Sequence, residues 1–199
     1  MVEDALALLG TGKLRGADYA DEKVFRGGVE VLDLCCGSGA IGVSIAKLHK
    51  GAKVTCADVS AKALAVAKKN AAANGCKGVK FVESDLFAAS DFHRRFGKGK
   101  YQLIISNPPY LTAREMQNLM PETAREPAMA LDGGADGLIF YRAICDIWAK
   151  KLHPNGVLAV EIGETQGQAV KALFEAAGLR DVRIHKDLGA LDRAVSGVR

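Results

Sequence analysis

In the stretch QLIISNPPY, residues 102–110, an apolar run typical of a buried strand stops at Asn107 and is followed by two prolines. Prolines cannot continue a central sheet, because they lack the N–H group that a strand ladder needs. The Asn107 side-chain oxygen and the Pro108 carbonyl are two hydrogen-bond acceptors on a turn whose geometry the prolines fix. Such a pair can hold both N–H groups of a planar amide or aromatic amine, and Tyr110 can pack against the planar group. An ordinary proline turn is the alternative interpretation.

A second motif, DLCCGSGAIG at 33–42, follows an apolar run and opens a helix-like stretch. Gly37, Gly39 and Gly42 fit the GxGxxG pattern, in which glycines let the backbone turn tightly and approach a nucleoside-containing cofactor. The pattern fits NAD nearly as well as S-adenosylmethionine. A glycine turn that binds nothing is the structural alternative.

Acidic residues end the next two apolar runs. Asp58, in VTCADVS, can accept both hydroxyls of an adenosine ribose, which favours a cofactor without a 2′-phosphate. Asp85, in ESDLF, can accept from an adenine amino group, with Leu86 against the ring. For both acids, capping of the following segment is the alternative. Because the carboxyl ends of parallel strands meet at one edge of a sheet, we expect both to face the glycine loop and Asn107.

Together these motifs favour the transfer of a methyl group from a sulfonium to a planar nitrogen. Delocalisation makes that nitrogen a poor nucleophile, and two fixed acceptors help hold its lone pair out of conjugation and stabilise the charge that develops. A general base is not required, because the methylated nitrogen becomes acidic and can lose its proton to water. The four scattered histidines, which show no catalytic spacing, agree with this chemistry.

Apolar, strand-like runs alternate with helix-like segments along the chain. Strands are expected at 29–36, 52–59, 78–87, 101–107, 156–163, 181–188 and 193–199, and helices at 40–50, 61–75, 138–152 and 165–178. This order predicts a mostly parallel sheet with helices on both faces. The last two strands have no helix between them, so they should pair as an antiparallel hairpin. We therefore expect one α/β domain, residues 1–199, with a seven-stranded, Rossmann-like sheet that carries one antiparallel strand near the C-terminus.

The connection at 111–137 is longer than the roughly 12–15 residues usual between elements, which is typical of a lid or a binding loop. It contains Met116, Met120 and Met129 and ends in LDGGADG. These methionines either line a substrate surface or pack the loop onto the core, and the second interpretation is preferred.

Composition excludes several classes of protein. The chain has 199 residues, 49% hydrophobic and 25% charged, as in ordinary globular proteins. No apolar run reaches the roughly 18 residues of a membrane helix, and MVEDALALLG lacks the features of a secretory signal. The net charge of +4 permits a nucleic-acid partner but does not argue for one. The basic cluster at 93–100 is interpreted as a solvated helix end and turn, and contact with phosphates or an acidic partner is the alternative. Five cysteines without a CxxC pair predict reduced, buried thiols in the cytoplasm and no metal site.

Five motifs resemble the HemK-like glutamine N5-methyltransferases that modify peptide chain release factors: DLCCGSGAIG, SNPPY, EPAMALDGGADGLIFYRAI, GVLAVEIG and KDLGALDRAV. The likeness covers nearly the whole chain and implies a class I methyltransferase fold. It implies S-adenosylmethionine as cofactor, bound through Asp33, Cys35, Cys36, Gly37, Ser38, Gly39, Asp58, Asp85, Leu86 and Asn107. It also implies a release factor as protein substrate, whose Gly-Gly-Gln glutamine is gripped by Asn107, Pro108, Pro109 and Tyr110, with Asn107, Pro108 and Tyr110 catalytic.

The sequence departs from that family in two ways. The family usually has a helical N-terminal domain that docks the release factor, followed by a PRP-containing segment, and this sequence begins after both. A separate docking domain or subunit is therefore a second expected partner. Cys35 stands where many relatives have the first glycine of the loop, and a small buried thiol is a tolerable substitute.

Two other functions stay open at this point. NPPY also occurs in N6-adenine methyltransferases that act on DNA or RNA, but such an enzyme would need a basic groove or a target-recognition domain. Alternatively, the chain is a cofactor-binding module without catalytic activity.

Overall fold

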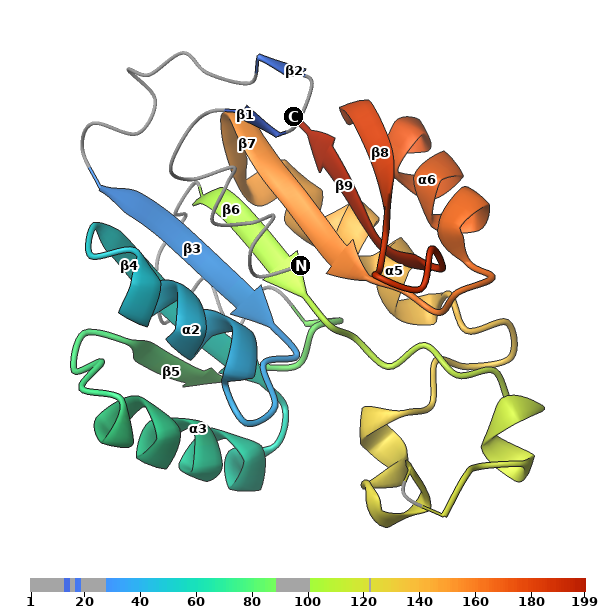
Figure 1. Ribbon diagram of the computed structural model, residues 1–199, viewed down its shortest axis with the longest axis horizontal. Helices are drawn as coiled ribbons and strands as arrows, with labels where there is room; N and C mark the ends of the chain where they lie inside the picture. Colours follow the sequence, from blue (N-terminus) through green and yellow to red (C-terminus); the bar gives the residue numbers. More distant parts are fainter. Residues whose placement is uncertain (1–12, 15–16, 19–27, 89–100, 122) are drawn as a thin grey trace.

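The computed structural model contains one large twisted sheet with helices packed on both of its faces (Figure 1). The residues that it describes are 13–14, 17–18, 28–88, 101–121 and 123–199. The basic cluster at 93–100 and the N-terminal stretch 1–10 lie outside them. Two short strands, β1 (Lys13–Leu14) and β2 (Ala17–Asp18), pair antiparallel and form a second, two-stranded sheet.

The large sheet has seven strands in the order β5-β4-β3-β6-β7-β9-β8. They are β3 (Val29–Leu34), β4 (Ala52–Asp58), β5 (Lys80–Glu83), β6 (Tyr101–Ser106), β7 (Leu152–Glu161), β8 (Arg180–Lys186) and β9 (Asp192–Val198). Strands β3 to β7 pair in parallel, whereas β9 runs antiparallel to both β7 and β8. The predicted fold class, strand number and C-terminal hairpin are therefore confirmed.

Successive residues of a strand point to opposite faces, so this sheet builds two cores. On one face, Val31 of β3 packs in a cluster that includes Ile45 of α2 (Ala40–Leu48) and Leu64 of α3 (Ala61–Ala73). On the other face, Leu32 packs in a cluster to which α5 (Ile139–Ala143) and α6 (Gly167–Ala176) contribute, with Phe174 of α6 fully buried. Both faces are thus closed, and ligands are left only the edges of the sheet.

The segment predicted as one helix over 138–152 consists of three different helical turns. Helix α5 continues into a π-helical turn, Ile144–Trp148, and then into a 3₁₀ turn, Ala149–Lys151. Trp148 is fully buried, and its indole N–H donates to the Leu86 carbonyl at 2.8 Å. The anchoring of this ring explains why the regular helical repeat, which the sequence pattern predicts, is not kept here. None of the helices in the described part of the chain is long and apolar enough to cross a membrane.

The connection between β6 and α5, called here the 111–137 loop, extends from the carboxyl edge of the sheet (Figure 1). It contains the 3₁₀ turns Glu115–Gln117, Thr123–Arg125 and Ala128–Ala130. Its end returns to its start, because Leu111 donates to the Leu131 carbonyl at 2.9 Å and Gly133 donates to the Leu111 carbonyl at 2.8 Å. The loop is therefore closed at its base.

Candidate active site

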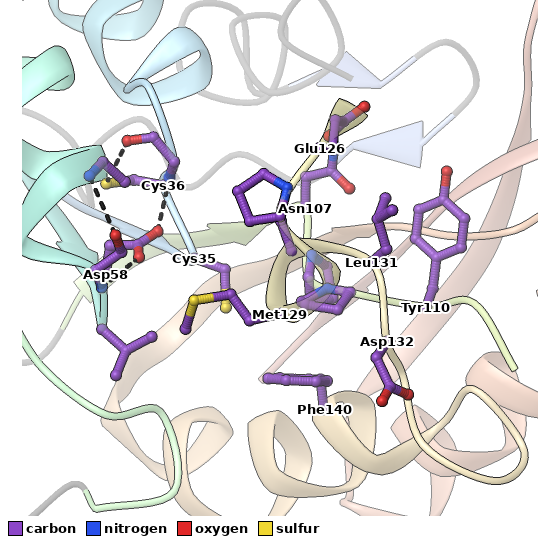
Figure 2. Close-up of a pocket in the computed structure, with 18 of the residues that line it drawn as sticks. Cys35, Cys36, Asp58, Asn107, Tyr110, Glu126, Met129, Leu131, Asp132 and Phe140 are labelled. Atoms are coloured by element: carbon purple, nitrogen blue, oxygen red, sulfur yellow. Dashed lines mark hydrogen bonds between the residues drawn. The ribbon is translucent and has the colours of Figure 1, made fainter. Parts of the chain in front are cut away.

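A cavity of about 930 Å³ lies at the carboxyl edge of the sheet, between the glycine loop, the ends of β4, β5 and β6, and the 111–137 loop. Figure 2 shows Cys36 and Asp58 at one end of this cavity and Asn107 and Tyr110 toward the other. Of the residues expected to form the site, those that line the cavity are Cys35, Cys36, Gly37, Ser38, Asp58, Asp85, Leu86, Asn107, Pro108, Pro109 and Tyr110. Asp33 and Gly39 do not line it.

The glycine loop needs a left-handed backbone at three positions. Gly37 has φ +54° and Gly39 has φ +79°, and Cys35 also adopts φ +53°, a conformation that is costly for a residue with a side chain. A Cβ atom on Gly37 would meet no atom within 4 Å, so this position is open. A Cβ atom on Gly39 would lie 3.0 Å from the Ala67 Cβ, so Gly39 lets α3 approach the loop.

Asp58 joins the end of β4 to the glycine loop. Its Oδ2 accepts from the Gly37 N–H and its Oδ1 from the Ser60 N–H, both at 2.8 Å. Ser60, whose Oγ accepts from the Ala63 N–H at 3.2 Å, is the cap of α3. Asp58 is therefore not the residue that caps the helix. Each of its oxygens keeps lone-pair capacity for a ligand hydroxyl.

Asp33 supports the glycine loop from the core. It is fully buried, its Oδ2 accepts from the Gly42 N–H at 2.8 Å, and its Oδ1 has no hydrogen-bond partner. Burial raises the pKa of Asp33 to about 7, which the Gly42 hydrogen bond opposes and the charge of Asp58 reinforces. A Cβ atom on Gly42 would lie 2.6 Å from the Cys56 sulfur and 2.9 Å from the Asp33 Oδ2. Glycine at this position thus allows the carboxylate to reach the loop.

Apolar and aromatic groups form the part of the cavity beyond β5. Leu86 is buried, and the Asp85 Oδ1 accepts from the Phe87 N–H at 2.9 Å, which leaves its second oxygen available. The rings of Phe87 and Phe140 lie 5.2 Å apart with a 51° angle between their planes. Phe140 comes from α5, far away in the sequence, and the sequence analysis did not identify it. Its only local signal is that it belongs to the EPAMALDGGADGLIFYRAI motif.

The NPPY turn presents Asn107 beside two buried prolines. Asn107 is exposed to the cavity, Pro108 and Pro109 are buried, and Tyr110 is half-buried. Asn107 follows Ser106, which pairs with Val160 of β7, so it comes next to Glu161. Burial raises the pKa of Glu161, and Arg193 and a hydrogen bond with Asn107 partly offset that rise. The turn is thus rigid at its prolines and open at the asparagine.

The cavity wall is acidic. Among the residues described, no lysine, arginine or histidine lines it. Apart from thiols and one tyrosine, its ionisable side chains are all carboxylates: Asp58, Asp85, Glu115, Glu126 and Asp132.

Met120 and Met129 also line the cavity, with exposed fractions of 69% and 58%. The preferred interpretation, that the loop methionines pack onto the core, is wrong for these two, because the loop extends beyond the sheet and leaves them no core to reach. No group of three or more His, Cys, Asp or Glu side chains suited to a metal ion is found in the described part of the chain.

Known proteins resemble this chain in sequence and in fold. The methyltransferase small domain model matches residues 22–139. The chain is 41% identical over 170 residues to a release factor glutamine methyltransferase from Caulobacter vibrioides, covering 85% of this chain and 57% of that protein. It is 45% identical over 168 residues to one from Cereibacter sphaeroides, covering 83% and 58%. The chain thus spans between half and two thirds of the length of these curated relatives.

Two solved structures share the fold. TrmN from Thermus thermophilus matches with a TM-score of 0.63 and 20% identity, over 100% of this chain and 48% of that one. Magnesium protoporphyrin IX methyltransferase from Synechocystis, with bound SAM, matches with a TM-score of 0.57 and 16% identity, over 100% and 77%. With a family match that extends over more than half of its residues, the chain belongs to the methyltransferase small domain family.

Proposed function

We propose that this chain transfers a methyl group from S-adenosylmethionine to the side-chain amide nitrogen of a protein glutamine, in the Gly-Gly-Gln loop of peptide chain release factors. The observation that carries the proposal is that Asn107 and Pro108, which directly follow β6, line the same cavity as Gly37 and Asp58. The identity to release factor glutamine methyltransferases supports the choice of substrate.

The residues of the cavity fit S-adenosylmethionine. Small-molecule sites usually measure about 300–1,000 Å³, and the present cavity is at the upper end, at about 930 Å³. The open space above Gly37 admits a ligand close to the backbone, and Asp58 offers two oriented oxygens for ribose hydroxyls. Leu86 and the Phe87–Phe140 pair offer an apolar surface for adenine, with the free Asp85 oxygen for its amino group. When bound, the cofactor supplies an electrophilic methyl group on a sulfonium.

The NPPY turn acts on the nucleophile. The Asn107 side-chain oxygen and the Pro108 carbonyl each accept one N–H of the glutamine amide, which fixes the nitrogen and turns its lone pair away from the carbonyl π system. Because both prolines are buried, these acceptors are oriented before the substrate arrives. Tyr110 packs against the amide plane. The proton that the nitrogen loses after methylation goes to water, so no residue needs to act as a general base.

The charge of the cavity favours a peptide over a nucleic acid. Glu115, Glu126 and Asp132 line it from the 111–137 loop, and no basic side chain does among the described residues. Phosphate groups near these carboxylates would be repelled, whereas nucleic-acid sites gather Lys and Arg. A glutamine loop carries no such charge and enters without this penalty.

Residues 1–199 form one catalytic domain, and docking of the release factor uses a further domain or subunit. Such a substrate puts the reaction in the cytoplasm.

The proposal is tested by incubating the chain with isotopically labelled S-adenosylmethionine and, separately, a purified release factor, DNA and RNA. We expect label only on the release factor, with one added methyl group on the Gly-Gly-Gln glutamine by tandem mass spectrometry. Label on adenine alone would move the assignment to an N6-adenine methyltransferase. Binding of the cofactor without transfer to any substrate, also when a docking subunit is added, would favour a non-catalytic module.

A further inference from the structure

We propose that Gln166 is a positioning residue that fixes the NPPY turn and ties together both ends of the 111–137 loop. Gln166 directly precedes α6, and it belongs to none of the motifs from which the site was predicted. Its side-chain Nε2 donates to the Tyr110 carbonyl at 2.9 Å and to the Gly137 carbonyl at 3.2 Å. Tyr110 comes just before the loop and Gly137 ends it, so one amide group holds both ends.

The oxygen of the same amide is also held. The Gln166 Oε1 accepts from the Gly163 N–H at 3.0 Å, and it lies 3.4 Å from the Tyr141 hydroxyl oxygen. An amide has two N–H donors and two lone pairs on its oxygen, and here both donors and one lone pair have partners. Since carbonyls only accept hydrogen bonds, the NH₂ group must face Tyr110 and Gly137. The orientation of this side chain is thus determined by its surroundings.

Glycines make room for the contact. A Cβ atom on Gly137 would lie 2.5 Å from both the Gln166 Nε2 and the Tyr110 carbonyl oxygen. A Cβ atom on Gly163 would lie 3.1 Å from the Gln166 Oε1. The Tyr141 hydroxyl, next to the Gln166 Oε1, donates its proton to the Glu161 carbonyl at 2.9 Å, at the end of β7 next to Asn107. The network therefore links the start of α6 to the strand ends on which the acceptors sit.

The side chain is not used to stabilise its own helix. Gln166 occupies the N-cap position of α6, but it makes no side-chain capping bond there. Residues at this position commonly accept from the first N–H groups of the helix. The Gln166 amide instead contacts the turn and the loop, so its loss should affect those segments more than α6.

Gln166 does not line the cavity and touches neither of the proposed acceptors directly. Gln166 acts on the acceptors indirectly, by holding the Tyr110 carbonyl two residues after Pro108. Loss of this hydrogen bond should therefore lower kcat for methyl transfer and leave cofactor affinity unchanged. The catalytic consequence rests on the proposed function, whereas the restraint on the loop does not.

The test compares Gln166→Glu with Gln168→Glu, using the whole 199-residue chain. Both changes replace an amide by a carboxylate at the start of α6. Gln168 is exposed, whereas a carboxylate introduced at position 166 could not donate to the two carbonyls. Gln166→Met, which removes the donors without adding charge, is the second variant. We measure hydrogen exchange across residues 111–137, kcat on a release factor, and the Kd of S-adenosylhomocysteine.

For Gln166→Glu and Gln166→Met we expect faster exchange in 111–137 and a kcat at least about tenfold lower. In both variants the Kd of S-adenosylhomocysteine stays within about twofold of that of Gln168→Glu. Exchange and kcat equal to those of Gln168→Glu would overturn the proposal, and so would a changed Kd with an unchanged kcat. If the wild-type chain methylates no release factor, the proposed function fails, while the exchange comparison still decides whether Gln166 restrains the loop.

Discussion

The Asp58 carboxylate and the Gly37 N–H are joined by a 2.8 Å hydrogen bond that links the end of β4 to the glycine loop. The other Asp58 oxygen accepts from the Ser60 N–H at the same distance. Two main-chain donors thus orient one carboxylate toward the cavity that Gly37 leaves open. Such charge-assisted bonds are stronger than neutral ones. This pair is the structural basis of the proposed cofactor site.

Replacing Asp58 by alanine should therefore weaken cofactor binding more than it slows transfer. Removal of a charged acceptor typically costs about 1.5–3 kcal/mol, or about 10–150-fold in affinity. Calorimetric titration with S-adenosylhomocysteine measures that loss, and kcat at saturating cofactor should stay within a few-fold of the wild type. Glu83→Ala, which removes an exposed carboxylate of β5 that does not line the cavity, is the matched control. An unchanged affinity in Asp58→Ala would mean that this carboxylate does not bind the ligand.

Asp33 should make the folded protein less stable as the pH rises. Its folded-state pKa of about 7 lies above the ordinary value of 3.8 because of burial. The folded state therefore holds a proton that the unfolded state releases, and this contribution to stability is complete below about pH 4 and is lost as the pH passes about 7. One pKa unit corresponds to about 1.4 kcal/mol, so the fall is on the order of 4 kcal/mol.

Asp33→Asn isolates this effect. Urea denaturation of both proteins between about pH 4 and pH 8 should show the wild type losing stability relative to the variant as the pH rises. Parallel pH profiles would show that Asp33 titrates normally.

Gly133 should tolerate no side chain. A Cβ atom there would lie 2.8 Å from both the Tyr110 Cα and its carbonyl carbon, which are backbone atoms that cannot rotate away. Overpacking of this kind costs about 1–3 kcal/mol, and it displaces the NPPY turn. Gly133→Ala should therefore lower both the urea midpoint and the single-turnover rate of transfer. Gly78→Ala, whose Cβ would meet no atom within 4 Å, should change neither.

The Cys35 thiol should be unreactive although it lines the cavity. Loss of solvent around the thiol is the largest cause that raises the pKa of Cys35 to about 12, and the negative charge of Asp58 adds to it. Only the thiolate reacts with iodoacetamide, so at about pH 8 alkylation of the folded chain should be at least about tenfold slower than that of the urea-unfolded chain. Peptide mass spectrometry reads the rate at this one cysteine. Equal rates in the two states would contradict a raised pKa of the half-buried Cys35 thiol.

The pattern of the sequence predicts the sheet well because strands and glycine turns are local signals. The run VEVLDL forms β3. Its successive residues Val31 and Leu32 lie in the two different cores, because neighbouring side chains of a strand point to opposite faces of the sheet. The helix at 138–152 is less regular than its pattern indicates, because Trp148 is held by a carbonyl from a distant segment. The sequence pattern likewise does not identify Phe140 and Gln166 as residues of the site. Their partners, Phe87 and Tyr110, lie far away in the sequence and are brought near only by the fold.

The central claim is that the side-chain oxygen of Asn107 holds the nitrogen that is methylated. The most direct measurement is the single-turnover rate of methyl transfer to the release factor glutamine by the wild type and by Asn107→Ala, with the Kd of S-adenosylhomocysteine measured in parallel. Loss of a fixed transition-state acceptor should slow transfer about 10²–10³-fold, with the Kd changed by less than about fivefold. Transfer by Asn107→Ala at the wild-type rate would contradict the account.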